Sequence, residues 1–403
     1  MAHNIDPQWY VPQSYVNKER LTFGVEIEFA LASLPAGAKD PHPEDTREAY
    51  RISDDPSGKE MNLKFKMRRD YVEPWHVPGS ILNENARNHI SKTFTEAGIQ
   101  NEVITADTIE HADQFANWHP KDPRSWAITH DRDVLPPDDA PPEYRRHAME
   151  LNSPPLYFSP EAVQEVMYVI ELVSNTYRCA LTRRTALHIH VGNSKIGFSP
   201  ETLQKLAATY LTFEPALEQT QPYFYIDDLM TASLRRGSEL NGEELIPDKE
   251  KRTYPNFLEY LLKDEHCDTK ILKKAVATMF SPEERSDRRG ALNFSNIDTG
   301  RGTKNTVEFR QHASTFDPQE IAHWIRLCVG FLEFADTVEK STLRPFLEAH
   351  INDKIEDFGL ENALLSLGLP REAEYYGNFL KRIAGQRNEK GQYLGTLFSD
   401  FKN

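Results

Sequence analysis

The stretch LTFGVEIEF, residues 21–29, alternates apolar side chains with other side chains along its whole length. One row contains Leu21, Phe23, Val25, Ile27 and Phe29, and the other contains Glu26 and Glu28. Because successive side chains of a strand point to opposite faces, the two carboxylates share a face and lie about 7 Å apart. An exposed sheet face and a metal site both explain such a pair, so the remaining sequence must separate the two readings.

Three later stretches repeat the alternation. Their polar positions are Glu150 and Asn152 in 148–153, His188 and His190 in 185–192, and Glu308, Arg310 and His312 in 305–312. For any single strand a solvated face is the better reading, since half-buried sheets alternate in this way. Taken together, however, these positions lack the Lys, Thr, Ser and Gln of a plain solvated face. Carboxylates at short range need cations, and a carboxylate-rich set without Cys suits Mg²⁺ or Mn²⁺ better than Zn²⁺.

A phosphorylated ligand is the second expectation from these strands. Arg310 lies two residues from Glu308 on one strand, a suitable place for an arginine that contacts a phosphoryl group. The chain contains no Walker A loop, no G-x-G-x-x-G and no H-E-x-x-H. Any nucleotide would therefore be held without a glycine-rich phosphate loop. The H-x-H pair of His188 and His190 is a weak signal alone, because it also occurs in strands that bind nothing.

Composition limits the classes of protein that fit. The 403 residues carry a formal net charge of −15, which argues against broad binding to nucleic acid or to an anionic membrane. The three cysteines, Cys179, Cys267 and Cys328, form no C-x-x-C pair, and Cys179 and Cys328 fall in helical patterns that predict buried free thiols. The sequence shows neither an apolar signal segment at its start nor a stretch of 18 uncharged apolar residues. We therefore expect a cytoplasmic protein.

The fold class follows from the order of the predicted elements. Helices are predicted to begin at Ser159-Pro160, Ser199-Pro200 and Asp317-Pro318, where an N-cap residue precedes proline. A further helix is predicted over 82–98, and further strands over 101–105, 124–130 and 290–297. Strands come close together in pairs without a regular β-α-β alternation, so we predict an α+β fold with a largely antiparallel sheet. We expect a catalytic core over 1–335, with insertions at about 34–74 and 214–289, and a helical extension over 336–403.

Five motifs in a fixed order resemble the amidoligase family, which belongs to the carboxylate–amine ligase superfamily with glutamine synthetase and glutamate–cysteine ligase. They are FGVEIEF (23–29), WAITHDRD (126–133), MELNSPPL (149–156), LHIHVG (187–192), and RGALNF (289–294) with NTVEFRQHASTFD (305–317). Each motif alone is weak, but their order over most of 21–335 is specific. The resemblance implies a glutamine-synthetase-like core with a curved sheet, active-site groups on its concave face and helices on the other.

The resemblance also implies ATP-dependent amide formation, in which a carboxylate takes the γ-phosphate and an amine captures the acyl phosphate. By this resemblance Glu26, Glu28, Glu150, Glu308 and one of His188 and His190 match the ligands of the divalent ions, and we take His190 as that ligand. Arg310 matches the residue that stabilises the transferring phosphoryl group, and we name Arg310, Glu308 and His190 as candidate catalytic residues. Our candidates for binding the cofactor are Arg310, His188, Asn152, Arg235 and Arg289. The substrates would be a small-molecule or peptide carboxylate and an amine, such as an amino acid, ammonia or a protein side chain. The sequence indicates nothing about the oligomeric state.

Some positions depart from the family pattern or remain open. Thr185-Ala186 stands where the family has Cys-Gly, Asp133 stands where it has Ser, and Ala313-Ser314 replaces a glycine position. Asp131 and Asp133 are either metal ligands or turn caps, and the sequence favours the caps. The dibasic pairs Arg235-Arg236 and Arg288-Arg289 are more often solvated than functional. Gln311 and His312 are candidates for supporting the site.

Two other functions compete with the ligase. A phosphotransferase of the same fold would phosphorylate a guanidino or carboxyl group and stop there. A non-catalytic binding protein would keep the fold alone, although the retained glutamates and arginine argue against it.

Overall fold

The structure is a computed structural model. It describes residues 21–52, 81–104, 122–131, 134, 143–194, 196–226, 231–279, 289–297, 304–388 and 393–394. The chain divides into two compact units and passes from one to the other within strand β1 and within helix α2. The first unit comprises residues 1–25, 155–167 and 187–396, and the second comprises 26–154, 168–186 and 397–403.

The second unit is built around β1 (Thr22–Pro35), most of which belongs to it. Its strands follow the order β3 (Asn101–Val103), β4 (Trp126–Thr129), β5 (Arg145–Asn152) and β1. The pairs β4–β5 and β5–β1 are antiparallel, whereas β3–β4 is parallel. Two short strands, β2 (Tyr50–Ile52) and β7 (Cys179–Ala180), also pair with β1. Helix α1 (Ile81–Glu96) packs on β3, β4 and β5.

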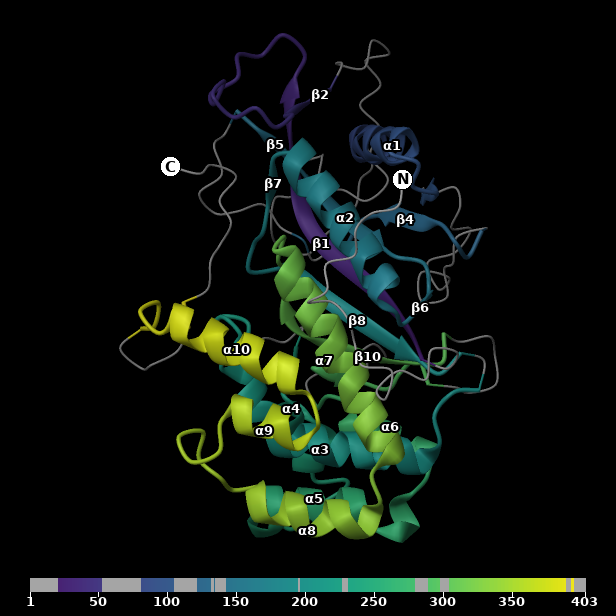
Figure 1. The fold of residues 1–403 in the computed structure, drawn as a ribbon, viewed down its shortest axis with the longest axis vertical. Helices are drawn as coiled ribbons and strands as arrows, with labels where there is room; N and C mark the ends of the chain where they lie inside the picture. Colours follow the sequence, from purple (N-terminus) through teal and green to yellow (C-terminus); the bar gives the residue numbers. More distant parts are fainter. Residues whose placement is uncertain are drawn as a thin grey trace. The chain divides into compact units, whose positions relative to one another are not determined.

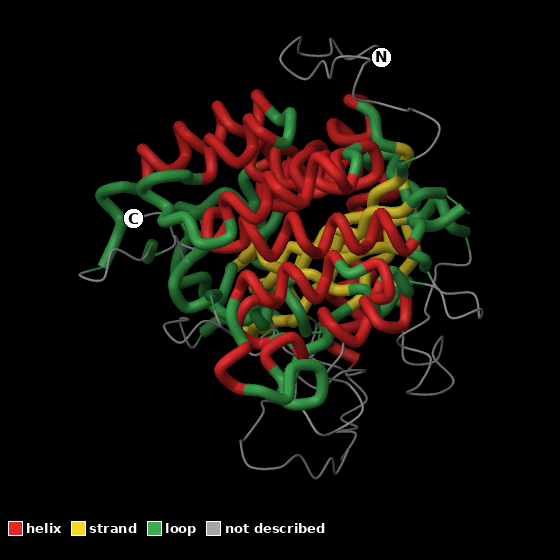
Figure 2. Tube along the Cα trace, turned by 90° about the horizontal axis from the view of Figure 1, so that it is seen from below, coloured by secondary structure: helices red, strands yellow, loops and turns green. Residues whose placement is uncertain are grey.

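The first unit contains the strands β8 (Ala186–Gly192), β10 (Thr306–Ala313) and β9 (Leu292–Asn293), which are neighbours in that order. Strand β6 (Leu156–Tyr157) pairs antiparallel with the first residues of β1. The β10–β9 pair is antiparallel as well, and Glu308 lies opposite Asn293. Figure 2 distinguishes the strands, in yellow, from the helices, in red.

Helices make up most of the first unit. They are α3 (Pro200–Glu218), α4 (Leu234–Gly237), α5 (Tyr254–Leu262), α6 (Thr269–Val276), α7 (Pro318–Thr337), α8 (Lys340–His350), α9 (Leu360–Ser366) and α10 (Pro370–Ile383). Short 3₁₀ helices occupy Glu239–Asn241, Lys249–Lys251 and Asp264–His266. Helix α3 is almost wholly buried and contacts α5, α7 and α8, so it is the centre of this unit (Figure 1). Tyr210 of α3 packs against Phe309 of β10, with ring centroids 6.3 Å apart.

The predicted α+β fold with a largely antiparallel sheet is confirmed, and so are the predicted helix starts; the sheet is not closed. Helix α2 spans Pro160–Thr176, and Ser199 and Asp317 cap α3 and α7 with their side chains. Curvature of the sheet, a glutamine-synthetase-like core and the domain boundary at 335 stay predictions. No described helix is long and apolar enough to cross a membrane.

Two local expectations were wrong. Cys179 lies in strand β7 and not in a helix, because α2 ends at Thr176. Its thiol is nevertheless buried and outside any disulfide, as is that of Cys328 in α7. The four prolines within 131–147 predict a loop over that range, but the loop ends earlier because β5 already begins at Arg145. Part of that loop, including Asp133, lies outside the described residues, as do most of 34–74 and Arg288.

Candidate functional site

Three carboxylates of the second unit come together on neighbouring strands. Glu28 of β1 lies directly opposite Glu150 of β5, and Asp131 follows the end of β4, which is the other neighbour of β5. One oxygen from each of Glu28, Asp131 and Glu150 lies within 4.8 Å of the others. Like charges directly opposite one another destabilise a strand pair, and a bound cation would offset that repulsion. Carboxylate oxygens at this spacing are the ligands that Mg²⁺ and Mn²⁺ prefer.

The surroundings of the acidic cluster hold its carboxylates in place. Glu28 is only 5% exposed, and its Oε2 accepts a hydrogen bond of 2.9 Å from the backbone N–H of Ala186. Asn152 donates from Nδ2 to Oε1 of Glu150 at 2.6 Å. Ala186 stands where the family has glycine, and its contact with Glu28 uses the main chain alone. The departure at this position therefore leaves the contact intact.

Asp131 is the member of this cluster that the sequence did not favour as a metal ligand. The sequence favoured a turn cap for it, whereas the structure brings its carboxylate to Glu28 and Glu150. The WAITHDRD motif already marked Asp131 as a candidate ligand. Only the pairing of β4 with β5 shows that this motif lies beside the strand that carries Glu150. Glu26, the first residue of the second unit, lies opposite Asn152 in the β1–β5 register and is half-buried.

The first unit contains a second polar group, centred on Glu308 of β10. Oε1 of Glu308 accepts a hydrogen bond of 2.6 Å from Nη1 of Arg310 and lies 3.6 Å from Nδ1 of His188. Nε2 of His190 lies 3.8 Å from the same oxygen. His188 and His190 share a face of β8 because they are two residues apart. The structure thus brings together four predicted residues, and we call them the Glu308 cluster: Glu308, Arg310, His188 and His190.

Two residues that the sequence did not single out complete this cluster. Asn293 of β9 donates from Nδ2 to Oε2 of Glu308 at 2.7 Å, and Thr306 Oγ1 lies 3.1 Å from Nδ1 of His190. Both belong to motifs quoted for the family resemblance, which was the available signal. Asn293 leaves Oε1 of Glu308 to Arg310 and the histidines. Nη1 of Arg310 also approaches Nδ1 of His188 at 3.4 Å, so one guanidinium nitrogen contacts both neighbours.

Arg235 and Arg289 are not joined to the Glu308 cluster by any hydrogen bond within the described residues. Arg235 is buried in α4 and donates to the carbonyl oxygens of Leu211, Thr212 and Ile351. The carbonyl oxygen of Arg289 accepts a hydrogen bond from the N–H of Ala232. Their assignment as cofactor-binding residues stays a prediction.

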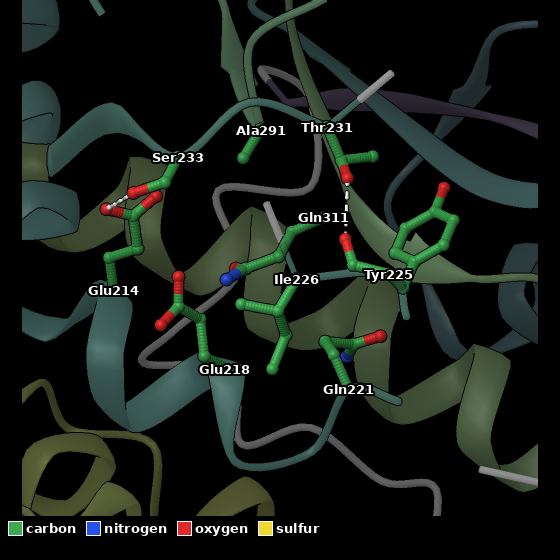
Figure 3. A pocket seen from close by; sticks show the side chains of 9 residues that line it. All are labelled: Glu214, Glu218, Gln221, Tyr225, Ile226, Thr231, Ser233, Ala291 and Gln311. Atoms are coloured by element: carbon green, nitrogen blue, oxygen red, sulfur yellow. Dashed lines mark hydrogen bonds between the residues drawn. The ribbon is translucent and has the colours of Figure 1, made fainter. Parts of the chain in front are cut away.

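Gln311 and His312 make their contacts elsewhere in the first unit. Gln311 accepts a 2.7 Å hydrogen bond from Tyr210 Oη and lines a cavity of about 10 Å³ beside α3, shown in Figure 3. In that cavity Glu214 accepts a hydrogen bond from Ser233 Oγ at 2.9 Å, a contact that ties α3 to α4 (Figure 3). His312 packs on Trp324 at 4.9 Å, and burial lowers its pKa to about 4. These two side chains support the packing of β10 on α3 and α7.

The fold and these clusters define an α+β protein whose sheet strands carry acidic and arginine-containing clusters suited to cations and to phosphoryl groups. The sequence profile of a family described as "Putative amidoligase enzyme" matches residues 19–332. The chain belongs to this amidoligase family, as the motifs predicted. The family's description names an enzyme that forms amides, so membership indicates a ligase. No protein of curated function and no solved structure gives a significant match.

Proposed function

We propose that this protein is an ATP- and Mg²⁺-dependent carboxylate–amine ligase, which forms an amide through an acyl phosphate. The observation that carries the proposal is the acidic cluster of Glu28, Asp131 and Glu150 in a chain of the amidoligase family. A ligase that uses ATP must neutralise the phosphates, and carboxylate-held divalent ions do this in many nucleotide enzymes.

The donor set of the acidic cluster fits a hard divalent cation. All three side chains offer carboxylate oxygens, none is a cysteine, and Glu28 is buried. Glu28, Asp131 and Glu150 would therefore hold Mg²⁺ or Mn²⁺, and the family resemblance adds Glu26, His190 and Glu308 as further ligands. The bound ions would screen the charge of the ATP phosphates.

The Glu308 cluster supplies the other part of the proposed chemistry. The Arg310 guanidinium is partly exposed, so it can reach a phosphoryl group in transit and stabilise its charge. Glu308 fixes the direction of that guanidinium through the 2.6 Å hydrogen bond. His188 and Asn152, each beside a carboxylate of these clusters, are placed to contact the nucleotide or to hold those carboxylates. The substrate carboxylate attacks the γ-phosphorus, ADP leaves, and the amine then displaces phosphate from the acyl phosphate.

Product analysis tests the proposal. The full-length protein is incubated with ATP, Mg²⁺ and mixtures of carboxylic acids and amines, and ADP, free phosphate and new amides are measured. A ligase releases ADP and phosphate only when both an acid and an amine are present. The variant Glu28→Gln should lose this turnover, whereas Glu171→Gln, the same change at an exposed position of α2, should keep it.

The competing functions give different results in the same experiment. A phosphotransferase would release ADP and leave a stable phosphorylated substrate, with no free phosphate. Failure to bind ATP in the presence of Mg²⁺ or Mn²⁺ would contradict both enzymatic proposals and favour the binding protein.

A further inference from the structure

A hollow of about 350 Å³ lies in the first unit, away from the strands. Its lining is Arg235, Arg236, Asn241, Arg252, Thr253, Tyr254, Pro255, Phe257 and Asn352. These residues come from α4, the 3₁₀ helix after it, the start of α5 and the turn that follows α8. No strand residue is among them, so this hollow is separate from the Glu308 cluster within its own unit. Its volume falls in the range that holds small-molecule ligands.

Arg235 is the deepest cation of the hollow. Its side chain is held by three backbone carbonyls: Nε donates to Leu211, and Nη2 donates to Thr212 and to Ile351. The remaining nitrogen, Nη1, makes no hydrogen bond to any described residue, and Arg235 forms no ion pair there, although the residue is only 7% exposed. Nη1 is not one of the solvent-excluded atoms that lack a hydrogen-bond partner, so it has accessible surface. It is therefore a fixed donor that a ligand in the hollow can reach.

Arg252 repeats this arrangement on another segment of the lining. Its Nε donates to the carbonyl of Ile246 and its Nη2 to that of Pro247, whereas Nη1 makes no hydrogen bond to a described residue. Its nearest carboxylate, Glu243, is 4.0 Å away on a side chain that is 91% exposed, so the pairing is weak. The third arginine, Arg236, pairs with Glu218. Two incompletely satisfied guanidinium groups thus line one hollow, in a chain with a net charge of −15.

The start of helix α5 adds to this positive potential. Thr253, the N-cap residue of α5, makes no capping hydrogen bond with its side chain, and Tyr254 and Pro255 of the first turn line the hollow. A helix N-terminus carries partial positive charge and attracts anions. Tyr254 lies under the Arg235 guanidinium, 4.5 Å from ring centroid to Cζ, and Phe257 adds a second aromatic wall. The hollow therefore offers donors for an anionic group beside an apolar surface.

We propose that this hollow binds a small organic dianion, whose phosphate or paired carboxylate oxygens accept hydrogen bonds from Nη1 of Arg235 and Arg252. Planar guanidinium groups recognise both kinds of oxyanion through paired N–H donors. Neither the acidic cluster nor the Glu308 cluster contributes to the hollow. Arg235, a predicted cofactor-binding residue, does line it, so the proposal gives this arginine a different ligand.

Direct binding tests this site, with inorganic phosphate and glutarate as separate probes in calorimetric titrations of the full-length protein. Asn352→Asp places a negative charge at an exposed position of the lining, where it repels a dianion without disturbing a buried contact. We expect at least one probe to bind, and the variant to bind it about tenfold more weakly or worse, which corresponds to about 1.4 kcal/mol. The preferred probe then identifies the anionic group.

Asn362→Asp on α9 is the matched control, because it makes the same change at an exposed residue outside the lining. It should bind the probe as the unmodified protein does. Arg252→Gln is a second test variant that removes one cation, and circular dichroism establishes that each variant is folded. The proposal is wrong if neither probe binds at millimolar concentration, or if Asn352→Asp and Asn362→Asp bind the probe equally well.

Discussion

Burial of the Glu28 carboxylate near other carboxylates has a free-energy cost. This carboxylate is buried opposite Glu150 and near Asp131, and the N–H of Ala186 satisfies one of its oxygens. Burying a charge beside two like charges is costly, and a bound cation would lower that cost. Arg310 and Glu308 show the opposite case, in which a cation and an anion two residues apart on β10 satisfy each other at 2.6 Å.

Replacement of Arg310 tests the proposed phosphoryl contact. We expect Arg310→Ala to lower ATP turnover by about 10²–10³, the usual effect of removing one group that stabilises transition-state charge. Folding should be largely retained, because Asn293 continues to donate to Glu308. The measurement is the steady-state release of ADP. Arg310→Lys, which keeps the charge but loses the planar fork, should retain more turnover, and undiminished turnover in Arg310→Ala would remove Arg310 from the mechanism.

Glu320 in α7 gives a prediction about pH. Burial raises the pKa of Glu320 to about 7, although the hydrogen bond from Thr315 acts against this shift. A carboxyl whose pKa is raised by folding binds more protons in the folded protein. The stability that Glu320 contributes is therefore fully present below the pKa that this carboxyl has in the unfolded chain. It is lost as the pH rises through 7. His312, 3.6 Å away, has a pKa of about 4 and is neutral in this range, so it does not offset the charge.

We expect Glu320→Gln to remove this loss, because glutamine is neutral and can still accept from Thr315. The variant should match the unmodified protein near pH 4.5 and be more stable at pH 8. The gain should be about 1–2 kcal/mol, less than the full pKa shift implies because 17% of the Glu320 side chain is exposed to water. Urea unfolding at both pH values measures it. Glu374→Gln, at an exposed position of α10, serves as the control, and an equal difference at the two pH values would contradict the prediction.

At the scale of elements, the helix starts were the most predictable feature of the chain. Ser199 accepts a hydrogen bond from the N–H of Thr202 at 3.0 Å, and Asp317 caps α7 by the same kind of contact. These signals are local, since a side chain and a backbone N–H two or three residues later suffice. The short strand β7 was missed for the opposite reason. It consists of two residues and exists only because Cys179 and Ala180 pair with Leu31 and Ala30 of β1.

The cap of α3 can be tested directly. Ser199→Ala should lower the free energy of unfolding by about 1 kcal/mol, because the N–H of Thr202 loses its acceptor. Ser199→Asp keeps an acceptor and adds a charge that suits a helix N-terminus, so it should be close to neutral. Urea denaturation of the three proteins provides the comparison, and equal midpoints for Ala and Ser would show that the cap contributes nothing.

At the scale of the whole molecule, the acidic cluster should couple metal binding to folding. An ion that binds only the folded chain stabilises it by about 2.7 kcal/mol at a hundred times its dissociation constant. We therefore expect Mg²⁺ or Mn²⁺ to raise the melting temperature and EDTA to reverse the rise. Differential scanning fluorimetry measures both, without reference to turnover.

Glu28→Gln should separate metal binding from folding in that experiment. The variant loses one of three anionic ligands, so the rise in melting temperature should shrink, whereas without metal it should be at least as stable because repulsion is reduced. The exposed Glu171→Gln control should respond to metal as the unmodified protein does. An unmodified protein that does not respond to either ion would contradict the metal site.

The sequence by itself determined the period of each strand, the helix caps and the order of the family motifs, because these depend on neighbouring residues or on short spacings. It therefore placed Glu26 with Glu28, His188 with His190, and Glu308 with Arg310, each on one face of one strand. Only the tertiary structure decided which strands are neighbours, and hence that Asp131 meets Glu28 and Glu150, that Asn293 faces Glu308, and that Arg235 turns to backbone carbonyls. Strand pairing joins residues that are far apart in sequence, and no local pattern records the partner.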